Sequence, residues 1–393
     1  MADGTRILHV GPPKTATTSI QAAFHASRKE LAKHSVVYAG RTRHSRAPAT
    51  AIAMEKLGVE FSRAALEQWD VLAQEIRESD ARVTVLSSEG LSYANVERGR
   101  RIVDQIGGAA HVVITMRPAA RMVPSVWQQR VRRGSDQPLD AWLEQVFDRD
   151  AAGEFTATHY WGRFGLDRLV ATWSDVVGAE NVTVVVLDPS DHDLAYRAFE
   201  DLVGVPSGTL SHVASLANES FPFAELETIR QFNELFYAAG GTRKEWLETI
   251  RKRGFGEFRQ PGSPQLTGAK ADVPRWVAEQ ANDVASGWIE ALRTFEGRLI
   301  GDPAHLLVDP SRYPETTAPP ETVPISSAGL LAHIMFDAAR RRGQAPSART
   351  AKKAAKAAGA PASPSPAAGS PVRARAAGAR RRLVRAWAAL RGA

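Results

Sequence analysis

Residues 6–21 read Arg-Ile-Leu-His-Val-Gly-Pro-Pro-Lys-Thr-Ala-Thr-Thr-Ser-Ile-Gln. A short apolar run leads into a Gly-Pro-Pro turn, and helical spacing follows, so the pattern predicts a strand, a tight loop and the start of a helix. A helix start presents unpaired N–H groups and the positive end of the helix dipole, which favours anion binding. Lys14 adds a positive charge, and Thr15, Thr17 and Thr18 add hydroxyl groups. Helix capping alone would not call for the lysine.

Strand and helix patterns alternate along the rest of the chain. Apolar runs predict further strands at about residues 35–39, 83–88, 111–116 and 181–187. Helical periodicity is found at about 19–33, 49–57, 63–78, 97–105, 158–177, 194–202, 223–236 and 274–298. This alternation predicts an α/β fold with three layers, in which helices flank a mostly parallel sheet.

Three groups of polar residues directly follow predicted strands. They are the Lys14 loop, Glu89 and Arg117. Ligands of parallel sheets bind at the carboxyl ends of the strands, so we expect all three to share one edge. That agreement favours a single active site.

The composition limits the functional classes. There is no Cys, which excludes disulfides, thiolate chemistry and Cys-ligated metals. Apolar residues make up 44%, enough for a sizeable core. The chain has 50 Lys and Arg, and 14 of them lie from Arg340 onwards, where there is no acid, so the other 339 residues carry 36 basic against 43 acidic side chains. The globular part is therefore mildly acidic, and the excess positive charge is on the tail.

The loop does not have the Walker A pattern of nucleoside triphosphate enzymes. Gly11 opens it, but the second glycine is missing and Lys14 follows only three residues later. The stretch Pro13-Lys14-Thr15-Ala16-Thr17-Thr18 instead resembles the Pro-Lys-[Ser/Thr]-Gly-Thr-Thr loop of sulfotransferases that use 3′-phosphoadenosine 5′-phosphosulfate (PAPS). Ala16 replaces the glycine, a mild departure provided that this residue needs no positive φ.

A second motif comes in the order that the resemblance implies. Arg117 ends a predicted strand and Ser125 lies eight residues later in the next helix, a spacing similar to the sulfotransferase segment that binds the 3′-phosphate. The guanidinium fork and the hydroxyl suit a terminal phosphate. Two helical turns rise about 11 Å, but the intervening turn can bring Ser125 back toward Arg117. Without a shared ligand, the two would be a surface arginine and an unrelated helix serine.

The resemblance implies a P-loop-like fold and a set of donor contacts. Residues for the 5′-phosphosulfate would be Pro13, Lys14, Thr15, Ala16, Thr17, Thr18 and Ser19. Arg251 and Lys252, in Arg251-Lys-Arg-Gly254, are a counterpart of the Arg-Lys-Gly loop of cytosolic sulfotransferases, with one extra residue before the glycine. A solvated basic loop is the alternative interpretation of that segment.

Sulfuryl transfer needs a base for the acceptor hydroxyl and a cation for the leaving oxygen. Lys14 suits the second role. Glu89 is the first candidate for the base, and His44 is the second because its ordinary pKa suits the task. Glu89 could instead only cap the next turn, and His44 could be a solvated loop histidine. No metal is expected, since no group of ligands has metal-binding spacing.

We therefore expect a PAPS-dependent sulfotransferase that acts on a hydroxyl or amine of an unidentified small-molecule or glycan acceptor, carbohydrate or lipid among them. A P-loop kinase or NTPase is the alternative. A third interpretation, phosphate binding centred on the tail, is treated as an added localisation function, with an anionic membrane or another polyanion as partner and no specific nucleic acid.

The expected domains are a catalytic domain over 1–315, a Pro-rich linker and helix over 316–343, and a disordered basic tail over 344–393. The tail has hardly any aromatic residue and cannot bury enough apolar surface to fold. No secretory signal pattern and no long apolar span is seen, so the expected location is cytoplasmic, with peripheral attachment at the inner membrane face through the tail.

Overall fold

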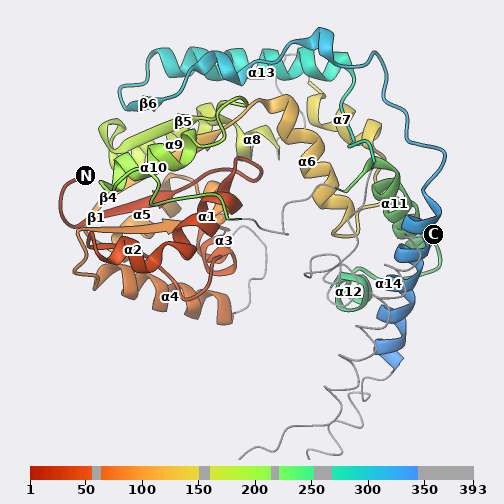
Figure 1. Ribbon diagram of the computed structural model, residues 1–393, viewed down its shortest axis with the longest axis horizontal. Helices are drawn as coiled ribbons and strands as arrows, with labels where there is room; N and C mark the ends of the chain where they lie inside the picture. The colour runs from red at the N-terminus through yellow and green to blue at the C-terminus, as the bar shows by residue number, and fades with distance from the viewer. Residues whose placement is uncertain (55–62, 150–159, 214–220, 252–267, 344–393) are drawn as a thin grey trace, which may run out of the picture. The chain divides into compact units, whose positions relative to one another are not determined.

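The computed structural model describes residues 1–54, 63–149, 160–213, 221–251 and 268–343. The chain contains a six-stranded sheet in which each strand runs parallel to its neighbours, in the order β2-β3-β1-β4-β5-β6. Figure 1 labels β1, β4, β5 and β6 of this sheet. The strands are β1 (Thr5–His9), β2 (Val36–Tyr38), β3 (Val83–Ser87), β4 (Ala109–Met116), β5 (Val182–Val186) and β6 (Arg298–Ile300). With helices on both faces, the fold is the expected three-layer α/β sandwich.

Strand β1 lies between β3 and β4, which fixes the position of the candidate site. Leu8 is opposite Leu86 of β3 and Val112 of β4. All three strands are parallel, so their carboxyl ends lie side by side at one edge of the sheet. The segments that follow them, which contain Lys14, Glu89 and Arg117, therefore begin at neighbouring positions along this carboxyl edge.

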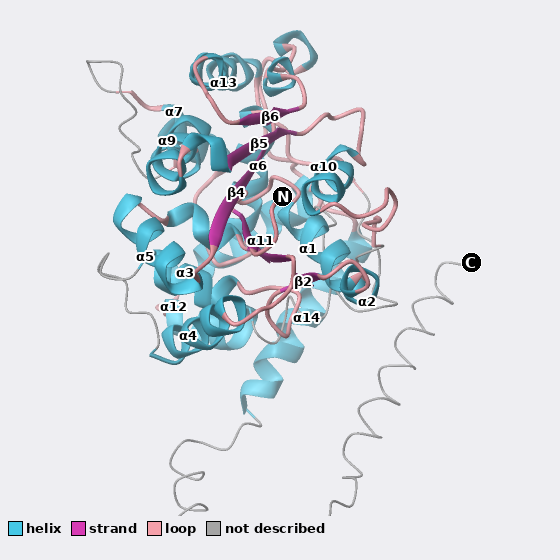
Figure 2. Cartoon of the chain, turned by 90° about the vertical axis from the view of Figure 1, so that its left-hand side faces the viewer, coloured by secondary structure: helices cyan, strands magenta, loops and turns pink. Residues whose placement is uncertain are grey.

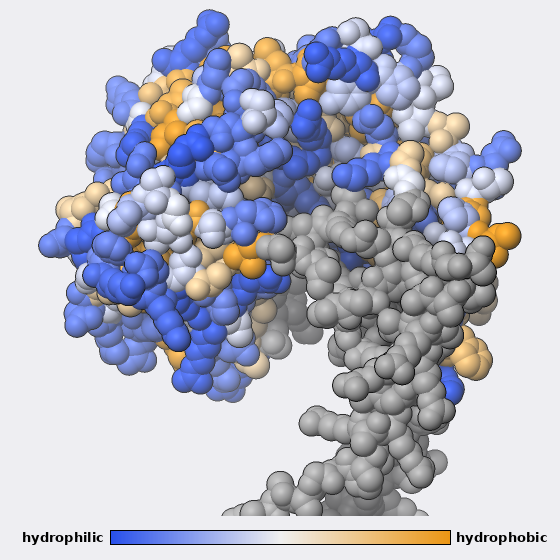
Figure 3. Space-filling model, in the orientation of Figure 1, coloured by the Kyte–Doolittle hydropathy of each residue, from blue (hydrophilic) through white to orange (hydrophobic). Residues whose placement is uncertain are grey.

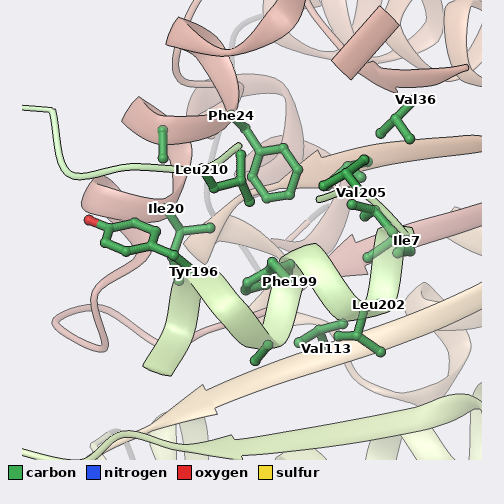
Figure 4. Close-up of a cluster of buried hydrophobic side chains, with 14 of the residues drawn as sticks. Ile7, Ile20, Phe24, Val36, Val113, Tyr196, Phe199, Leu202, Val205 and Leu210 are labelled. Atoms are coloured by element: carbon green, nitrogen blue, oxygen red, sulfur yellow. The ribbon is translucent and has the colours of Figure 1, made fainter. Parts of the chain in front are cut away.

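One face of the sheet is covered by α1 (Thr17–Ala26), α2 (Arg28–Ala32) and α10 (Leu194–Val203). Side chains from these helices and from the strands form a buried apolar cluster (Figure 4). Phe199 of α10 packs edge-on against Phe24 of α1, with ring centroids 5.5 Å apart. Both rings are fully buried. This packing holds the first turn of α1 against the sheet, directly after the Lys14 loop.

The opposite face is covered by α3 (Arg46–Met54), α4 (Arg63–Arg77), α5 (Val96–Ile106) and α9 (Leu166–Val177). Figure 2 shows these helices and α1, α2 and α10 on the two sides of the sheet. Helices α5 and α9 approach closely at Gly99, where an added Cβ would lie 2.7 Å from Val176. The remaining helical segments around the sheet are η1 (Glu89–Tyr93), α6 (Ala119–Val131), α7 (Leu139–Phe147), α8 (Trp161–Phe164), η2 (Ala179–Asn181), α13 (Arg275–Arg293), η6 (Pro303–Leu306) and η7 (Pro310–Arg312).

The chain divides into two compact units. The sheet unit comprises residues 1–130, 137–220 and 270–319, and the second unit comprises 131–136, 221–269 and 320 onwards. The second unit contains α11 (Phe223–Ala238), α12 (Arg243–Trp246), the π-helical turn η4 (Leu247–Arg251) and α14 (Ile325–Gly343). Its centre is Asn233 of α11, which donates to the carbonyls of Val131 and Ser135 and accepts from the indole of Trp246.

Most predicted elements are present, with differences in detail. The helix expected over 19–33 is broken at Ser27 into α1 and α2. The helix expected over 274–298 ends at Arg293, and strand β6 follows it. Helix α7 was not predicted. The tail from residue 344 onwards lies outside the described residues.

Hydrophobic surface is broken into small patches among hydrophilic residues on the face shown in Figure 3. In the part of the chain that the structure describes, every helix is too short or too polar to cross a bilayer.

Candidate functional site

The loop between β1 and α1 has an unusual backbone. Lys14 has φ 78° and Ala16 has φ 61°, both in the left-handed region that glycine favours. Alanine in place of the glycine of the Pro-Lys-[Ser/Thr]-Gly-Thr-Thr pattern is therefore not the mild departure that we expected, because this residue does need a positive φ. Such a conformation costs an L-residue about 1–2 kcal/mol, so the surrounding contacts must hold the loop in place.

The first turn of α1 has features of an anion site. Ala16 is its N-cap residue and offers no side-chain acceptor, and the first turn has no acidic residue. The N–H of Ser19 donates to the Ala16 carbonyl, whereas those of Thr17 and Thr18 have no acceptor one turn earlier and are available to a ligand. The buried hydroxyl of Thr17 has no hydrogen-bond partner among the described residues. Lys14, three residues before the start of this turn, is a half-buried residue.

His9, the last residue of β1, is fully buried beneath the loop. Its Nδ1 is 2.8 Å from the Ser87 hydroxyl on β3, and its Nε2 is 3.0 Å from the Thr115 hydroxyl on β4. Burial lowers the pKa of His9 to about 3, because the charged ring would lose its hydration. The ring is therefore neutral at physiological pH.

Thr115 connects this histidine to the loop. Its hydroxyl donates to the Thr15 carbonyl at 2.9 Å, and the Thr15 hydroxyl donates to the Pro12 carbonyl at 2.8 Å. Gly11 leaves the room for this arrangement, since an added Cβ would lie 2.3 Å from Thr115 Oγ1 and 2.9 Å from His9 Nε2. Sequence reasoning did not single out His9 or Thr115. The available signal was a histidine inside an otherwise apolar strand.

Glu89 directly follows the end of β3. The preceding Ser88 is the N-cap of η1, and its side chain accepts from the N–H of Gly90 at 3.2 Å. Glu89 Oε1 forms an ion pair with Arg46 at 3.1 Å, and both side chains are partly exposed. The cap is therefore supplied by Ser88, and the Glu89 carboxylate lies at the rim of the carboxyl edge beside a basic group.

His44 lies near Glu89 but has both ring nitrogens engaged. Its Nδ1 is 2.6 Å from the Gln21 amide oxygen, and its Nε2 accepts from Arg43 Nε at 2.9 Å. Desolvation lowers the pKa of His44, and the charge of Arg43 lowers it further, although Glu89 acts in the opposite direction. Gln21 also donates to the Ser87 carbonyl, so His44 is anchored to the end of β3.

Arg117 and Ser125 lie next to each other, as the spacing predicted. Arg117 Nη2 is 3.4 Å from Ser125 Oγ and also donates to the Arg121 carbonyl. Desolvation lowers the pKa of Arg117 to about 10, so it remains charged at neutral pH. Its buried Nε has no hydrogen-bond partner in the described part of the chain, and the same holds for the buried hydroxyl of Tyr160. Burial raises the pKa of Tyr160, which therefore keeps its proton.

For the remaining candidates, Arg251 and Lys252, a role at this site stays a prediction. Arg251 ends η4 in the second unit. The side chain of Arg251, together with Lys252, lies outside the described residues.

The carboxyl edge thus offers a helix start with Lys14, a buried arginine with a serine, and a carboxylate at the rim. Within the described ranges, no group of three or more His, Asp or Glu side chains could hold a metal ion. Comparison with protein-family models and with curated proteins gives no match for this chain.

Proposed function

We propose that the protein is a sulfotransferase that moves the sulfuryl group of PAPS to a hydroxyl or amine acceptor. One observation supports this most strongly: the Lys14 loop and the Arg117–Ser125 pair follow the adjacent strands β1 and β4. These are two positively charged candidate sites for anions, at the ends of neighbouring strands. Such a pair suits a donor that carries phosphate groups at both its 5′ and its 3′ positions. When bound, PAPS would supply the sulfuryl group that is transferred to the acceptor.

The unpaired polar groups at the site support this fit. The uncapped first turn of α1 and the Thr17 hydroxyl would receive the 5′-phosphosulfate, with Lys14 beside it. The Nε of Arg117 and the Ser125 hydroxyl would receive the 3′-phosphate. A buried donor without a partner costs about 1–3 kcal/mol, and an anionic ligand would remove that cost.

The surroundings favour Glu89 over His44 as the general base. An imidazole acts as a base through a free lone pair, and that of His44 Nε2 already accepts from Arg43. Glu89 is partly exposed and pairs with Arg46, which is itself partly exposed, so the Glu89 carboxylate is accessible to an acceptor. In the proposed mechanism the Glu89 carboxylate accepts the acceptor's proton, and Lys14 neutralises the charge that develops on the leaving oxygen.

Titration calorimetry with adenosine 3′,5′-bisphosphate tests the donor site. We expect Lys14→Ala and Arg117→Ala each to weaken binding by about tenfold or more, since each removes a charge-assisted contact. Arg82→Ala is the matched control, because Arg82 also donates to backbone carbonyls, those of Val203 and Gly204, but lies before β3 at the opposite edge. It should change affinity by less than about twofold.

Binding that is unaffected by the first two variants would contradict the proposal. Tighter binding of ATP with Mg²⁺ than of the bisphosphate would favour the kinase or NTPase alternative.

Turnover of a screened acceptor tests the base. Glu89→Gln should lower kcat by about 10²- to 10⁴-fold and leave affinity for the bisphosphate unchanged, because it removes the proton acceptor and keeps the shape. His44→Asn, which keeps a polar group near Gln21, should have a much smaller effect. The reverse ranking would make His44 the base.

A further inference from the structure

The buried hydroxyl and imidazole groups under the loop form one connected network, in which Thr115 Oγ1 is 2.9 Å from the Thr15 carbonyl, 3.0 Å from Thr15 Oγ1 and 3.0 Å from His9 Nε2. The Thr15 carbonyl can only accept, so the single proton of Thr115 is donated to it. With that assignment, Thr115 Oγ1 accepts from His9 Nε2, and the neutral ring carries its proton there. His9 Nδ1 is left to accept from the Ser87 hydroxyl. A single chain of hydrogen bonds therefore runs from β3 through His9 and Thr115 to the loop backbone.

This chain ends at the strained part of the loop. Thr15 lies between Lys14 and Ala16, the two residues with positive φ. Its carbonyl and its hydroxyl are both held, by Thr115 and by the Pro12 carbonyl. Thr15, Thr115, Ser87 and His9 are all fully buried. A buried network in which each member has its partner is rigid, and it can hold a backbone that would otherwise relax.

We propose that His9 is a positioning residue for the anion-binding loop and acts through Thr115. It keeps Thr115 oriented toward the Thr15 carbonyl, and Thr15 keeps residues 14 and 16 in the conformation that aims the first N–H groups of α1 at the ligand. His9 itself does not touch the ligand. The inference rests on the proposed function for the identity of that ligand, but not for the ordering of the loop.

The sheet contains a second histidine that serves as a control. His111 of β4 is also buried, and its Nε2 is 2.8 Å from the hydroxyl of Thr183 on β5. Thr183 is the second residue of β5, at the end of the strand away from the site. Loss of the His111 contact therefore removes one buried histidine–threonine bond without affecting the loop.

The test uses asparagine and glutamine, whose amides replace different imidazole nitrogens. In His9→Asn the amide occupies the Nδ1 position, so the bond to Ser87 is kept and the bond to Thr115 is lost. In His9→Gln the amide reaches the Nε2 position and can still donate to Thr115. His111→Asn is matched to His9→Asn, because both lose the Nε2 bond to a threonine.

Two measurements are made on the full chain. Hydrogen exchange of the amides of Ser19 and Ile20, which donate to the Ala16 carbonyl, should become at least about tenfold faster in His9→Asn without ligand, since one buried hydrogen bond is lost. It should change little in His9→Gln and His111→Asn. Affinity for adenosine 3′,5′-bisphosphate should fall by about tenfold in His9→Asn and by less than about threefold in the other two. Unfolding by urea gives the stability of each variant.

Thr115→Val is the second route to the same result, if His9→Asn does not fold. It keeps the side-chain shape and removes the hydroxyl, and it should show the same faster exchange and weaker binding.

Unchanged loop exchange in both His9→Asn and Thr115→Val would overturn the inference. So would equal effects of His9→Asn, His9→Gln and His111→Asn that follow their stabilities, since His9 would then be only a structural residue. If the wild-type chain does not bind the bisphosphate, the proposed function fails, and the exchange measurement still decides the role of His9.

Discussion

His9 and His111 are the same residue type in the same kind of surroundings, but they serve different parts of the sheet. Both are buried, both bond a threonine on a neighbouring strand, and burial lowers the pKa of His9 to about 3 and that of His111 to about 4. His9 also bonds Ser87 on the other side, and its threonine continues to a loop. The two histidines thus differ in which groups their hydrogen bonds reach and not in burial, and only the contacts of His9 lead on to the loop.

The turns next to His9 and His111 differ in the same way. Before β4 the chain turns through Gly107 and Gly108, and before β5 through Gly178, and these glycines take positive φ without a side-chain penalty. At the carboxyl edge, Lys14 and Ala16 take positive φ with side chains attached. Strain at the carboxyl edge is maintained by the network under the loop, which is where a ligand site would need a fixed backbone.

Gly11→Ala should have the largest effect on stability, because it disrupts the network under the loop. Its Cβ would lie 2.3 Å from Thr115 Oγ1, with Thr15 Oγ1 and His9 Nε2 also within 3.0 Å, so the network has to move apart. We expect a loss of about 2–4 kcal/mol in the free energy of unfolding, from overpacking and broken buried hydrogen bonds, and loss of bisphosphate binding.

Gly287→Ala, measured in the same urea titration, is the control. Gly287 lies in α13 with open space around its Cβ position, so alanine should be neutral or stabilise by up to about 1 kcal/mol. If Gly11→Ala changes stability by as little as this control, the close approach under the loop has no energetic weight.

The pH dependence of stability should show what the two histidines share. The unfolded chain protonates each at its ordinary pKa of 6.5, while the folded chain does not until about pH 3 for His9 and about pH 4 for His111. The unfolded state therefore binds more protons as pH falls below 6.5, and the free energy of unfolding falls. Between pH 7 and pH 5.5 each histidine should contribute a loss of about 1 kcal/mol.

Urea unfolding at these two pH values should give a flatter dependence for His9→Asn and for His111→Asn, each by that amount. A steeper loss in either variant would mean that the histidine is charged in the folded protein. The two variants should therefore differ in the hydrogen exchange of the loop but not in the pH dependence of their stability.

Local patterns predicted the fold and the outline of the candidate site. Alternating apolar runs and helical spacing located β1, β3 and β4, and placement of their ends along one edge followed from parallel pairing. The pairing of Arg117 with Ser125 was also within reach, because only one turn separates the strand from the helix. Strand β6 was missed because it is short and mostly exposed, so it lacks a buried apolar pattern.

The network under the loop could not be predicted, because its members are distant in sequence. His9 is 78 residues from Ser87 and 106 from Thr115, and neither contact leaves a local pattern. The sequence also contains no signal of the positive φ of Ala16, since alanine normally avoids that conformation. Tertiary contacts decide both features, and local propensity gives no signal of either.

Ala16→Gly should have the smallest effect on stability, and it should stabilise the protein, whereas most substitutions destabilise. Ala16 has φ 61° and ψ 6°, so glycine removes the left-handed strain but adds freedom to the unfolded chain, for a net stabilisation of roughly 0.5–1 kcal/mol. Gly204, at the end of α10, allows the reverse substitution, because it is a glycine in the same left-handed region, with φ 65° and ψ 51°. Gly204→Ala should destabilise by about 1 kcal/mol, because the new Cβ meets only the flexible end of Arg82 and the cost is backbone strain alone. Thermal unfolding of both variants measures the pair. If Ala16→Gly destabilises the protein as Gly204→Ala does, the loop is not strained at Ala16, and the network that includes His9 has no strain to hold.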